Sequence, residues 1–301
     1  MVEKSVKLKY GENPHQKATW LQPSHTILLD DSYLSFNDVI NINLGFGFLR
    51  YFSEPLGVII KHANIVGLSV SESFSIRWRE AVKTDSRAAN NGILMVNHSL
   101  TIANIREIES FPFDGVVAPA YEKNTKSSLR LLTMRNTNLF DLPRTKVIDL
   151  FDGSKLVQDT FFSAIRCLND FDIYKGSKPS TFKEQDVLVA WYAACSIKTN
   201  CAVIVKEGQT IAVAAGHQDG VTAIEHAIHK AYYHANEQDL KNSVIAVDGN
   251  FPHDIPYEQI LKANISAFIL PGLAENDEIL LEQFMNSNCS VLFSKERCFY
   301  H

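Results

Sequence analysis

Apolar residues follow two alternating patterns along the chain. Short β-branched or apolar runs predict buried strands at residues 58–60, 93–96, 116–118, 244–247, 267–270 and 291–293. Such uninterrupted runs are typical of a sheet that is covered on both faces. Apolar residues at helical spacing predict helices over 70–82, 187–195, 224–232, 256–264 and 275–286. The alternation of strands and helices indicates layered α/β architecture.

The regular apolar pattern is interrupted near the middle of the chain and then resumes, which predicts two lobes. The segment from about 143 to 182 is irregular and contains turn residues, and regular patterning resumes after it. There, the runs at 202–205 and 211–214 flank Glu207-Gly208, which predicts a hairpin. We therefore expect one lobe over residues 1–150 and a second over 151–301.

Composition and charge exclude several classes of protein. The 301 residues are 46% hydrophobic and 21% charged, which is ordinary for a globular protein. The net charge of -5 shows no basic excess, so no nucleic-acid partner is expected. No apolar run approaches the roughly 18 residues of a membrane helix, and the N-terminal residues do not resemble a signal peptide. The five cysteines form no C-x-x-C pair and predict reduced thiols in a cytoplasmic protein.

Candidate chemistry follows the first predicted strand. Lys61-His62-Ala63-Asn64 comes directly after residues 58–60. Ligand sites in open α/β sheets gather at the carboxyl ends of strands. A histidine there can accept a proton near neutral pH, and a neighbouring lysine can neutralise developing negative charge. For a dipeptide alone, a solvated strand end is the commoner interpretation.

Both chain ends carry further unusual clusters. Tyr10-Gly11-Glu12-Asn13-Pro14-His15-Gln16 gathers polar side chains in a turn-rich stretch, which equally suits a capped polar turn. At the other end, Arg297-Cys298-Phe299-Tyr300-His301 alternates charged and aromatic residues, which suggests docking. Arg297 is suited to bidentate phosphate binding, although a surface arginine beside a packed phenylalanine is the alternative.

Nine short segments, taken together, resemble a known family. In order along the chain they are KYGENPHQ, VIIKHAN, DGVVAP, KLVQD, KTNCAVIVKEGQ, AAGHQDGV, VDGNFPHD, LPG and RCFYH. This order resembles the AICAR transformylase domain, the formyltransferase half of a bifunctional enzyme of purine biosynthesis, from about residue 8 to residue 301. The resemblance implies a duplicated cytidine-deaminase-like α/β/α fold and a homodimer with shared active sites. The cyclohydrolase domain that precedes the family domain is not in this sequence, so a stand-alone member is expected.

The resemblance also assigns catalytic roles. Lys61 and His62 match the family's catalytic pair, and Asn200 matches an asparagine that holds the base and amine. His62 would take the proton that the substrate amine loses as it attacks the formyl carbon of 10-formyltetrahydrofolate. Lys61 would assist the tetrahedral intermediate and the leaving folate nitrogen. The zinc-deaminase signature is absent, and Asn64 stands where a deaminase needs glutamate, so metal catalysis is not expected.

Further matches imply binding residues. Those for the nucleotide are Lys9, Tyr10, Asp114, His217 and Arg297, with Lys9 replacing the usual arginine. Those for the folate are Asn90, Val221, Asn250 and His253. Potassium, found in some members, would lie near Asp248 and His301.

Several of these positions depart from the family pattern. Asn90, Asn250 and His253 replace aromatic residues, His217 replaces a glutamine, and Gly220 replaces an arginine. An aromatic contact contributes about 0.5–1.5 kcal/mol beyond its area, so losing three weakens an unmodified folate site on the order of a hundredfold. Three hypotheses therefore remain. They are an AICAR-type formyltransferase, a paralog that formylates another amine in specialised metabolism, and a non-catalytic nucleotide-binding homolog.

Overall fold

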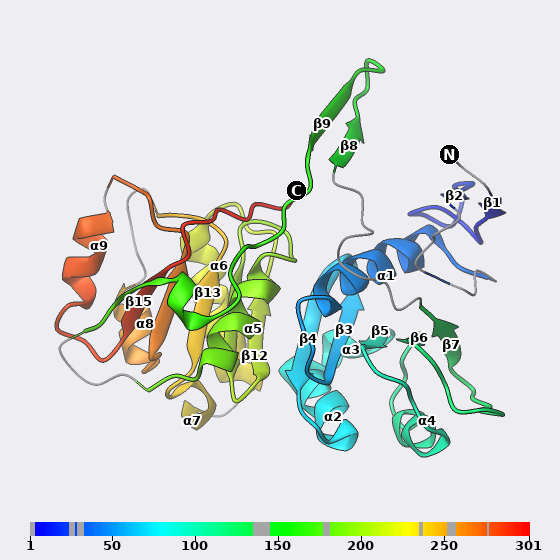
Figure 1. The fold of residues 1–301 in the computed structure, drawn as a ribbon, viewed down its shortest axis with the longest axis horizontal. Coiled ribbons are helices and arrows are strands. Elements are labelled where there is room, and N and C mark those ends of the chain that lie inside the picture. Colours follow the sequence, from blue (N-terminus) through cyan, green and yellow to red (C-terminus); the bar gives the residue numbers. More distant parts are fainter. Residues whose placement is uncertain are drawn as a thin grey trace.

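One large mixed sheet runs through the molecule. The computed structural model describes residues 4–23, 28, 33–134, 145–176, 181–234, 237–251, 257–275 and 277–301. In spatial order, the strands of the eleven-stranded sheet are β10 (Asp172–Tyr174), β15 (Ser290–Phe293), β14 (Ala267–Leu270), β13 (Val244–Val247), β11 (Ala202–Lys206), β12 (Gln209–Ala214), β4 (Asn64–Val70), β3 (Leu56–Lys61), β5 (Ile93–Val96), β6 (Gly115–Ala118) and β7 (Arg130–Thr133) (Figure 1).

Helices and two small hairpins complete the described fold. The helices are α1 (Phe36–Leu49), α2 (Phe74–Thr84), α3 (Ser86–Ala89), α4 (Ile102–Ile108), α5 (Glu184–Ala194), α6 (Gly220–His234), α7 (Glu237–Leu240), α8 (Tyr257–Lys262) and α9 (Asp277–Phe284), with a 3₁₀ turn at Leu168–Asp170. Separate two-stranded sheets pair β1 (Lys4–Lys7) with β2 (Thr19–Gln22) and β8 (Thr145–Asp149) with β9 (Lys155–Asp159).

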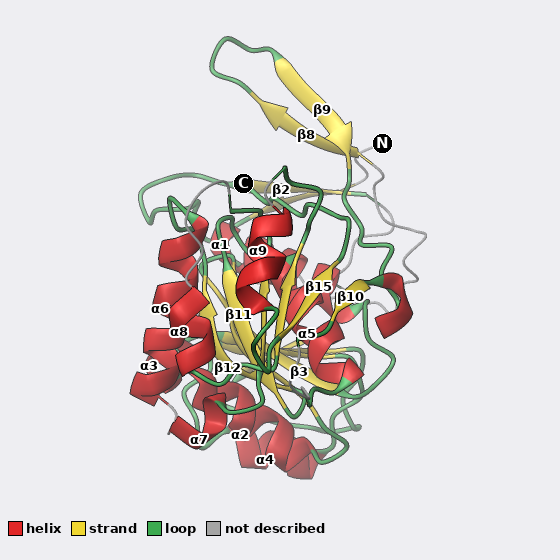
Figure 2. Cartoon of the chain, turned by 90° about the vertical axis from the view of Figure 1, so that its left-hand side faces the viewer, coloured by secondary structure: helices red, strands yellow, loops and turns green. Residues whose placement is uncertain are grey.

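The sheet lies between two layers of helices. Alternate residues of a strand point to opposite faces, so Val58 and Ile60 join the core under α1 and α5, whereas Ile59 joins the core under α2 and α4. Helices α6, α8 and α9 cover the second half of that other face. Figure 2 shows α6 and α8 to one side of the strands and α5 to the other. This arrangement confirms the predicted α/β class.

The two halves of the sheet repeat one topology. A hairpin (β3–β4 or β11–β12) is followed by a helix and by a strand antiparallel to the hairpin's first strand (β5 or β13). Parallel strands then extend each half outward. This repetition supports the expected duplication, while the likeness to cytidine deaminases and the division at residue 150 stay predictions. Residue 150 falls between β8 and β9.

Strand pairing and hydrogen bonds join the two halves directly. β4 meets β12 antiparallel, with Ser69 opposite Gln209. Val70 N–H donates to the Gly208 carbonyl at 2.8 Å, and the Thr84 hydroxyl donates to the Thr210 carbonyl at 2.7 Å. One continuous sheet therefore crosses the expected lobe boundary.

The strand predictions are confirmed, and one helix prediction is partly wrong. All six predicted runs form strands, and the Glu207-Gly208 hairpin is present. The helix expected from residue 70 begins only at Phe74, because residues 64–70 form β4. Periodicity missed β4 because its apolar residues are buried on both faces, and such a run has neither helical nor strand alternation. In the described part of the chain, no helix combines the length and apolar character needed to cross a membrane.

Candidate functional site

The Lys61–Asn64 segment forms the tight turn of the β3–β4 hairpin. His62 and Ala63 both have positive φ, of 53° and 55°. Two positive values at the central residues are characteristic of the hairpin turns that match strand twist. The Asn41 side chain of α1 accepts a hydrogen bond from Ala63 N–H at 2.8 Å, which fixes the turn to the helix. The His62 side chain is exposed.

The position of this turn corrects the argument from strand ends. β3 runs antiparallel to β4 and β5, so the turn lies at the edge where the parallel strands β5 and β6 begin. It is therefore not the carboxyl end of a parallel sheet. The Lys61 ammonium donates to the Asn90 carbonyl at 2.5 Å, and Asn90 itself is exposed beside it. The structure thus brings the lysine to one of the residues expected to bind folate.

Asn200 reaches the same edge from the second half. Asn200 and His217 exchange backbone hydrogen bonds at 3.1 Å, and the Asn200 side chain also donates to the His217 carbonyl at 3.1 Å. The Asn64 side chain accepts a bond from Lys198 N–H at 3.4 Å, which connects the hairpin turn to this segment. Lys61, His62, Asn200 and His217 therefore lie around one stretch of sheet edge.

Asp114 lies in a charged network that the sequence did not reveal. Arg130 contacts both carboxylate oxygens of Asp38, at 3.0 and 3.1 Å, and also forms an ion pair with Asp114. Burial opposes ionisation of Asp38, but its bonds from Arg130 and Ser35 outweigh that effect and lower its pKa. The signal for Arg130 was weak, because an arginine that starts a short strand is unremarkable in a sequence. The network ties Asp114 to the start of α1.

The N-terminal cluster lies at the same helix start. Lys9 N–H donates to the Leu34 carbonyl at 2.7 Å, and the Tyr10 carbonyl accepts from Phe36 N–H at 3.0 Å. The Lys9 ammonium lies 5.6 Å from the centre of the Tyr10 ring. Lys9 and Tyr10 are therefore placed by α1, the helix that also positions the Lys61–Asn64 turn.

The C-terminal segment passes beside Asn200. Thr199 N–H donates to the Tyr300 carbonyl at 3.0 Å, and Cys298 N–H donates to the Asp248 carbonyl at 3.4 Å. Arg297 is exposed and lies 5.3 Å from the ring centre of Phe299. The segment is therefore docked as expected, with the guanidinium left at the surface.

Asp248 and His301, the two expected potassium neighbours, differ in environment. Asp248 is buried; one of its carboxylate oxygens accepts from Cys201 N–H at 2.8 Å, and the other, Oδ2, has no hydrogen-bond partner among the residues that the structure describes. His301 is exposed, and its carbonyl accepts from Lys146 at 3.2 Å. Among the described residues, no group of three or more His, Cys, Asp or Glu side chains could hold a metal ion.

The expected folate residues lie in changed surroundings. The Asn250 side chain donates to the Gly272 carbonyl at 2.9 Å, so it braces a turn. A Cβ at Gly220 would come within 2.9 Å of the Phe251 ring, so the missing arginine coincides with an aromatic ring packed against the backbone. Val221 packs beside the core at the start of α6. His253 lies outside the described residues.

Comparison with known proteins gives a consistent result. The family model described as "AICARFT/IMPCHase bienzyme" matches residues 1–230. The bifunctional purine biosynthesis protein PurH of Oceanobacillus iheyensis is 29% identical to this chain, covering 99% of it and 60% of its own length. PurH of Thermoanaerobacter sp. is 28% identical, covering 99% of this chain and 59% of its own. The chain thus spans about three fifths of the length of the curated relatives it matches.

Proposed function

The chain belongs to the AICARFT/IMPCHase bienzyme family, and from this membership we propose that it transfers a formyl group from 10-formyltetrahydrofolate to the amine of an aminoimidazole ribonucleotide. The observation that carries the proposal is the meeting of the Lys61–Asn64 turn with the Lys198–Asn200 segment through Asn64. The residues matched to the family's catalytic groups come from opposite halves of the chain, and the fold brings them to one edge.

The reaction requires one bond to form and one to break. The amine nitrogen attacks the formyl carbon, and the resulting tetrahedral intermediate expels N10 of the folate. The exposed imidazole of His62 takes the amine proton, which finally resides on the departing nitrogen. The Lys61 ammonium stabilises the intermediate's oxygen, which becomes negatively charged. The Asn200 amide orients the acceptor.

The decisive assay mixes the protein with AICAR and 10-formyltetrahydrofolate and follows release of tetrahydrofolate. We expect His62→Ala to lower kcat by about a hundredfold or more, the typical contribution of a general base. Glu207→Ala is a matched control, because Glu207 opens the other hairpin turn with the same φ of 53°. Equal activity of wild type and His62→Ala, or no turnover by the wild type, would contradict the proposal.

A different acceptor amine is the second candidate. The packing of Phe251 over Gly220 and the use of Asn250 to brace Gly272 favour a reshaped site. This candidate predicts folate-dependent formylation of an amine other than AICAR. Competition between the candidate amine and AICAR for formyl transfer measures the preference.

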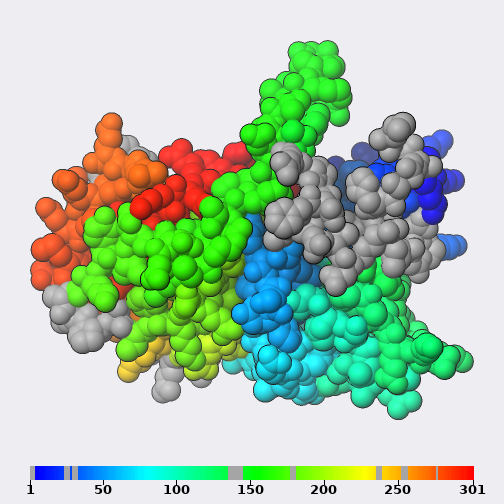
Figure 3. Space-filling view, viewed as in Figure 1, coloured from blue at the N-terminus to red at the C-terminus, as the bar shows by residue number. Residues whose placement is uncertain are grey.

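We also propose a homodimer. The β8–β9 hairpin stands away from the body (Figure 3) and exposes apolar side chains on both faces, including Leu156 at 56% and Val157 at 64%. An isolated two-stranded hairpin is only marginally stable in water, so a second copy that covers it would stabilise it. Sedimentation should give a dimer, and Leu156→Lys with Val157→Lys should give monomers.

Two further expectations concern potassium and location. The buried Oδ2 of Asp248 and the similarly buried Thr199 hydroxyl have no hydrogen-bond partner within the described part of the chain, and both fit a monovalent cation held by oxygen atoms. Such a cation would balance the Asp248 charge and hold the Thr199–Asn200 segment. The five cysteines are free, which supports a cytoplasmic location.

A further inference from the structure

Arg130, at the start of β7, joins two carboxylates that come from distant parts of the chain. Its Nη1 and Nη2 atoms donate to the two oxygens of Asp38 at 3.0 and 3.1 Å. Its Nε donates to the Asp114 carbonyl at 3.1 Å, and Nη2 also donates to Oδ2 of the Asp114 carboxylate. The rigid fork of a guanidinium suits such paired contacts, which the point charge of a lysine does not reproduce. Asp114 is therefore held through both its main chain and its side chain.

The two carboxylates are open to solvent to different degrees. The Asp38 side chain is 11% exposed, and it completes the cap of α1 by accepting from Ser35 N–H at 2.8 Å. The Asp114 side chain is 47% exposed, and its Oδ1 forms no hydrogen bond with any residue that the structure describes. Asp114, and not Asp38, can therefore offer a carboxylate oxygen to a ligand.

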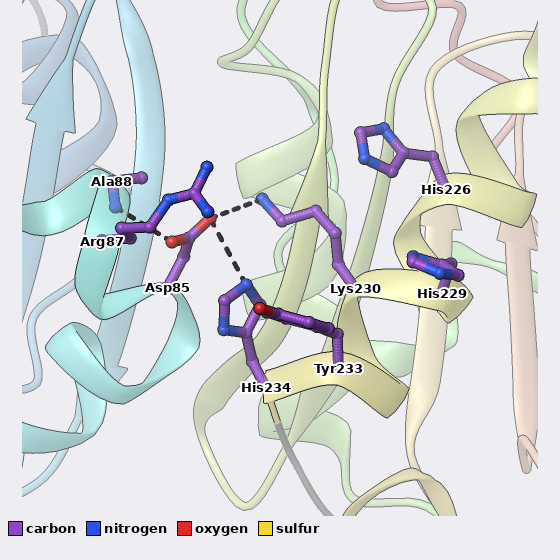
Figure 4. A pocket seen from close by; sticks show the side chains of 8 residues that line it. All are labelled: Asp85, Arg87, Ala88, His226, His229, Lys230, Tyr233 and His234. Carbon is purple, nitrogen blue, oxygen red and sulfur yellow. Dashed lines mark hydrogen bonds and ion pairs between the residues drawn. The ribbon is translucent and has the colours of Figure 1, made fainter.

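The carboxylate of Asp85, at the start of α3, provides a contrast. Its Oδ1 accepts from Ala88 N–H at 2.9 Å, and its Oδ2 pairs with Lys230 at 3.0 Å and lies 3.9 Å from His234 Nε2 (Figure 4). Both oxygens of Asp85 are thus occupied. Arg130 instead fixes Asp114 and leaves one oxygen open, which is how a supporting group preorganises a binding residue.

The contacts of Arg130 extend between two parts of the expected nucleotide site. Asp114 N–H donates to the Gly92 carbonyl at 2.9 Å, two residues beyond Asn90 in the sequence. On the other side of Arg130, the start of α1 donates a backbone hydrogen bond to the Tyr10 carbonyl at 3.0 Å. One guanidinium therefore connects the surroundings of the two expected nucleotide residues Asp114 and Tyr10.

We propose that Arg130 is a positioning residue of the nucleotide site, which holds Asp114 so that its Oδ1 accepts a hydrogen bond from a ribose hydroxyl of the acceptor. The inference rests on the proposed function, because that function supplies a ribonucleotide. A carboxylate that is free to rotate loses side-chain entropy when a ligand fixes it, whereas a carboxylate already fixed by Arg130 does not. Arg130 therefore contributes to affinity without contacting the substrate.

The effect of Arg130 should fall on KM and not on kcat. A ribose hydroxyl is remote from the amine that attacks, so its bond to Asp114 is as strong in the substrate complex as in the transition state. Loss of such a bond raises KM and leaves kcat unchanged. A merely structural role through Asp38 would instead loosen α1, which positions the Lys61–Asn64 turn, and would lower kcat.

The test measures kcat and the KM for AICAR at saturating 10-formyltetrahydrofolate. We expect Arg130→Gln to raise KM by about tenfold, as for one side chain that must be immobilised on binding, and to change kcat by less than about twofold. Arg130→Lys keeps the charge and loses the fork, so its KM should lie between those of wild type and Arg130→Gln. Arg79→Gln is the matched control and should change neither constant, because Arg79 pairs with Glu107 at 2.8 Å and with no expected nucleotide residue.

An Asp114→Ala background shows whether Arg130 acts through Asp114. Because the group that Arg130 positions is then absent, Arg130→Gln should raise KM by less than about a further twofold. Circular dichroism verifies the fold of each variant, and Arg130→Lys takes the place of Arg130→Gln if the latter does not fold. A rise in KM that persists undiminished in this background overturns the proposal. A fall in kcat without a rise in KM also overturns it.

Separate outcomes distinguish this proposal from the proposed function. If wild type turns over and has the same KM as both Arg130 variants, the positioning role is overturned and formyl transfer stands. If wild type shows no turnover, the proposed function fails, and calorimetry with AICAR tests Arg130 alone. An affinity loss of about tenfold in Arg130→Gln that disappears in the Asp114→Ala background then supports the role. Equal affinities, or no binding of AICAR to wild type, overturn it.

Discussion

At the scale of residues, single polar side chains hold the backbone that carries the candidate chemistry. Asn41 fixes Ala63, and Asn64 accepts from Lys198, so two amides place the hairpin turn relative to both α1 and the second half. Asn41 does not stand out in the sequence, and the motif that contains Asn64 does not reveal its bond to Lys198, because each amide acts through a backbone group far away in the chain. His62 depends on them for its position.

Asn41→Ala should reduce formyl transfer more than it reduces stability. The change leaves Ala63 N–H without its acceptor, at a cost of about 1–3 kcal/mol, and releases the turn that carries His62. We expect at least a tenfold lower kcat with the protein still folded. Asn37→Ala on the same helix is the control, since its side chain bonds the exposed Glu12 carbonyl and not the Lys61–Asn64 turn. Similar kcat values for both variants would argue against the positioning role.

His98 should make stability depend on pH. Burial first, and then the charge of Arg77, lowers the pKa of His98 from 6.5 to about 4. Between pH 6.5 and pH 4, His98 is therefore protonated in the unfolded chain but neutral in the folded protein. The free energy of unfolding falls as the pH drops from about 6.5 to about 4, because protonation favours the unfolded chain. His98→Gln should lose less stability than wild type over this interval in urea unfolding. If wild type and His98→Gln lost the same free energy of unfolding between pH 7 and pH 4.5, the assignment to His98 would be contradicted.

At the scale of elements, α1 is shaped by two glycines with opposite surroundings. A Cβ at Gly45 would overlap the Met95 side chain and come within 3.1 Å of Ile60, so this glycine lets the helix approach β3 and β5. A Cβ at Gly47 would meet no atom of the described residues within 4 Å. The close approach matters because α1 holds both the N-terminal cluster and the Lys61–Asn64 turn.

Gly45→Ala and Gly47→Ala should therefore change stability in opposite directions. Overpacking against the fully buried Met95 should cost about 1–3 kcal/mol. At Gly47 the alanine lowers the entropy of the unfolded helix residue and should gain about 0.5–1 kcal/mol. Thermal unfolding of the two variants and of wild type measures the direction of each change in stability. A stabilised Gly45→Ala would show that α1 does not pack closely here.

At the scale of the whole molecule, the junction between β4 and β12 makes the two halves one unit. Thr210 is 2% exposed, and its hydroxyl accepts from Leu68 N–H at 2.9 Å across the junction. The hairpins have the same topology, but β3–β4 presents its turn to the site, whereas β11–β12 presents its open end. The duplicated fold thus contributes different parts of each repeat to one edge.

Thr210→Val should destabilise both halves together. Leaving Leu68 N–H without its acceptor should cost about 1–3 kcal/mol. Trp78 and Trp191 are buried in opposite halves, and each reports on its own half in a variant that lacks Trp20 and the other of the two. We expect the unfolding midpoints reported by the two tryptophans to coincide, and Thr210→Val to lower both by the same amount. A shift confined to one tryptophan would mean that the halves unfold independently.

Local patterns in the sequence determined most strands, the second hairpin and the helices of the second half, because buried periodicity records which faces meet the core. The family motifs, in their order, indicated His62, Lys61 and Asn200 as candidates. β4 and the roles of Arg130 and Asn41 were decided only by the tertiary structure. Each depends on contacts between residues distant in the chain, such as Arg130 with Asp38 and Asn64 with Lys198. Spacing along a sequence carries no record of such contacts.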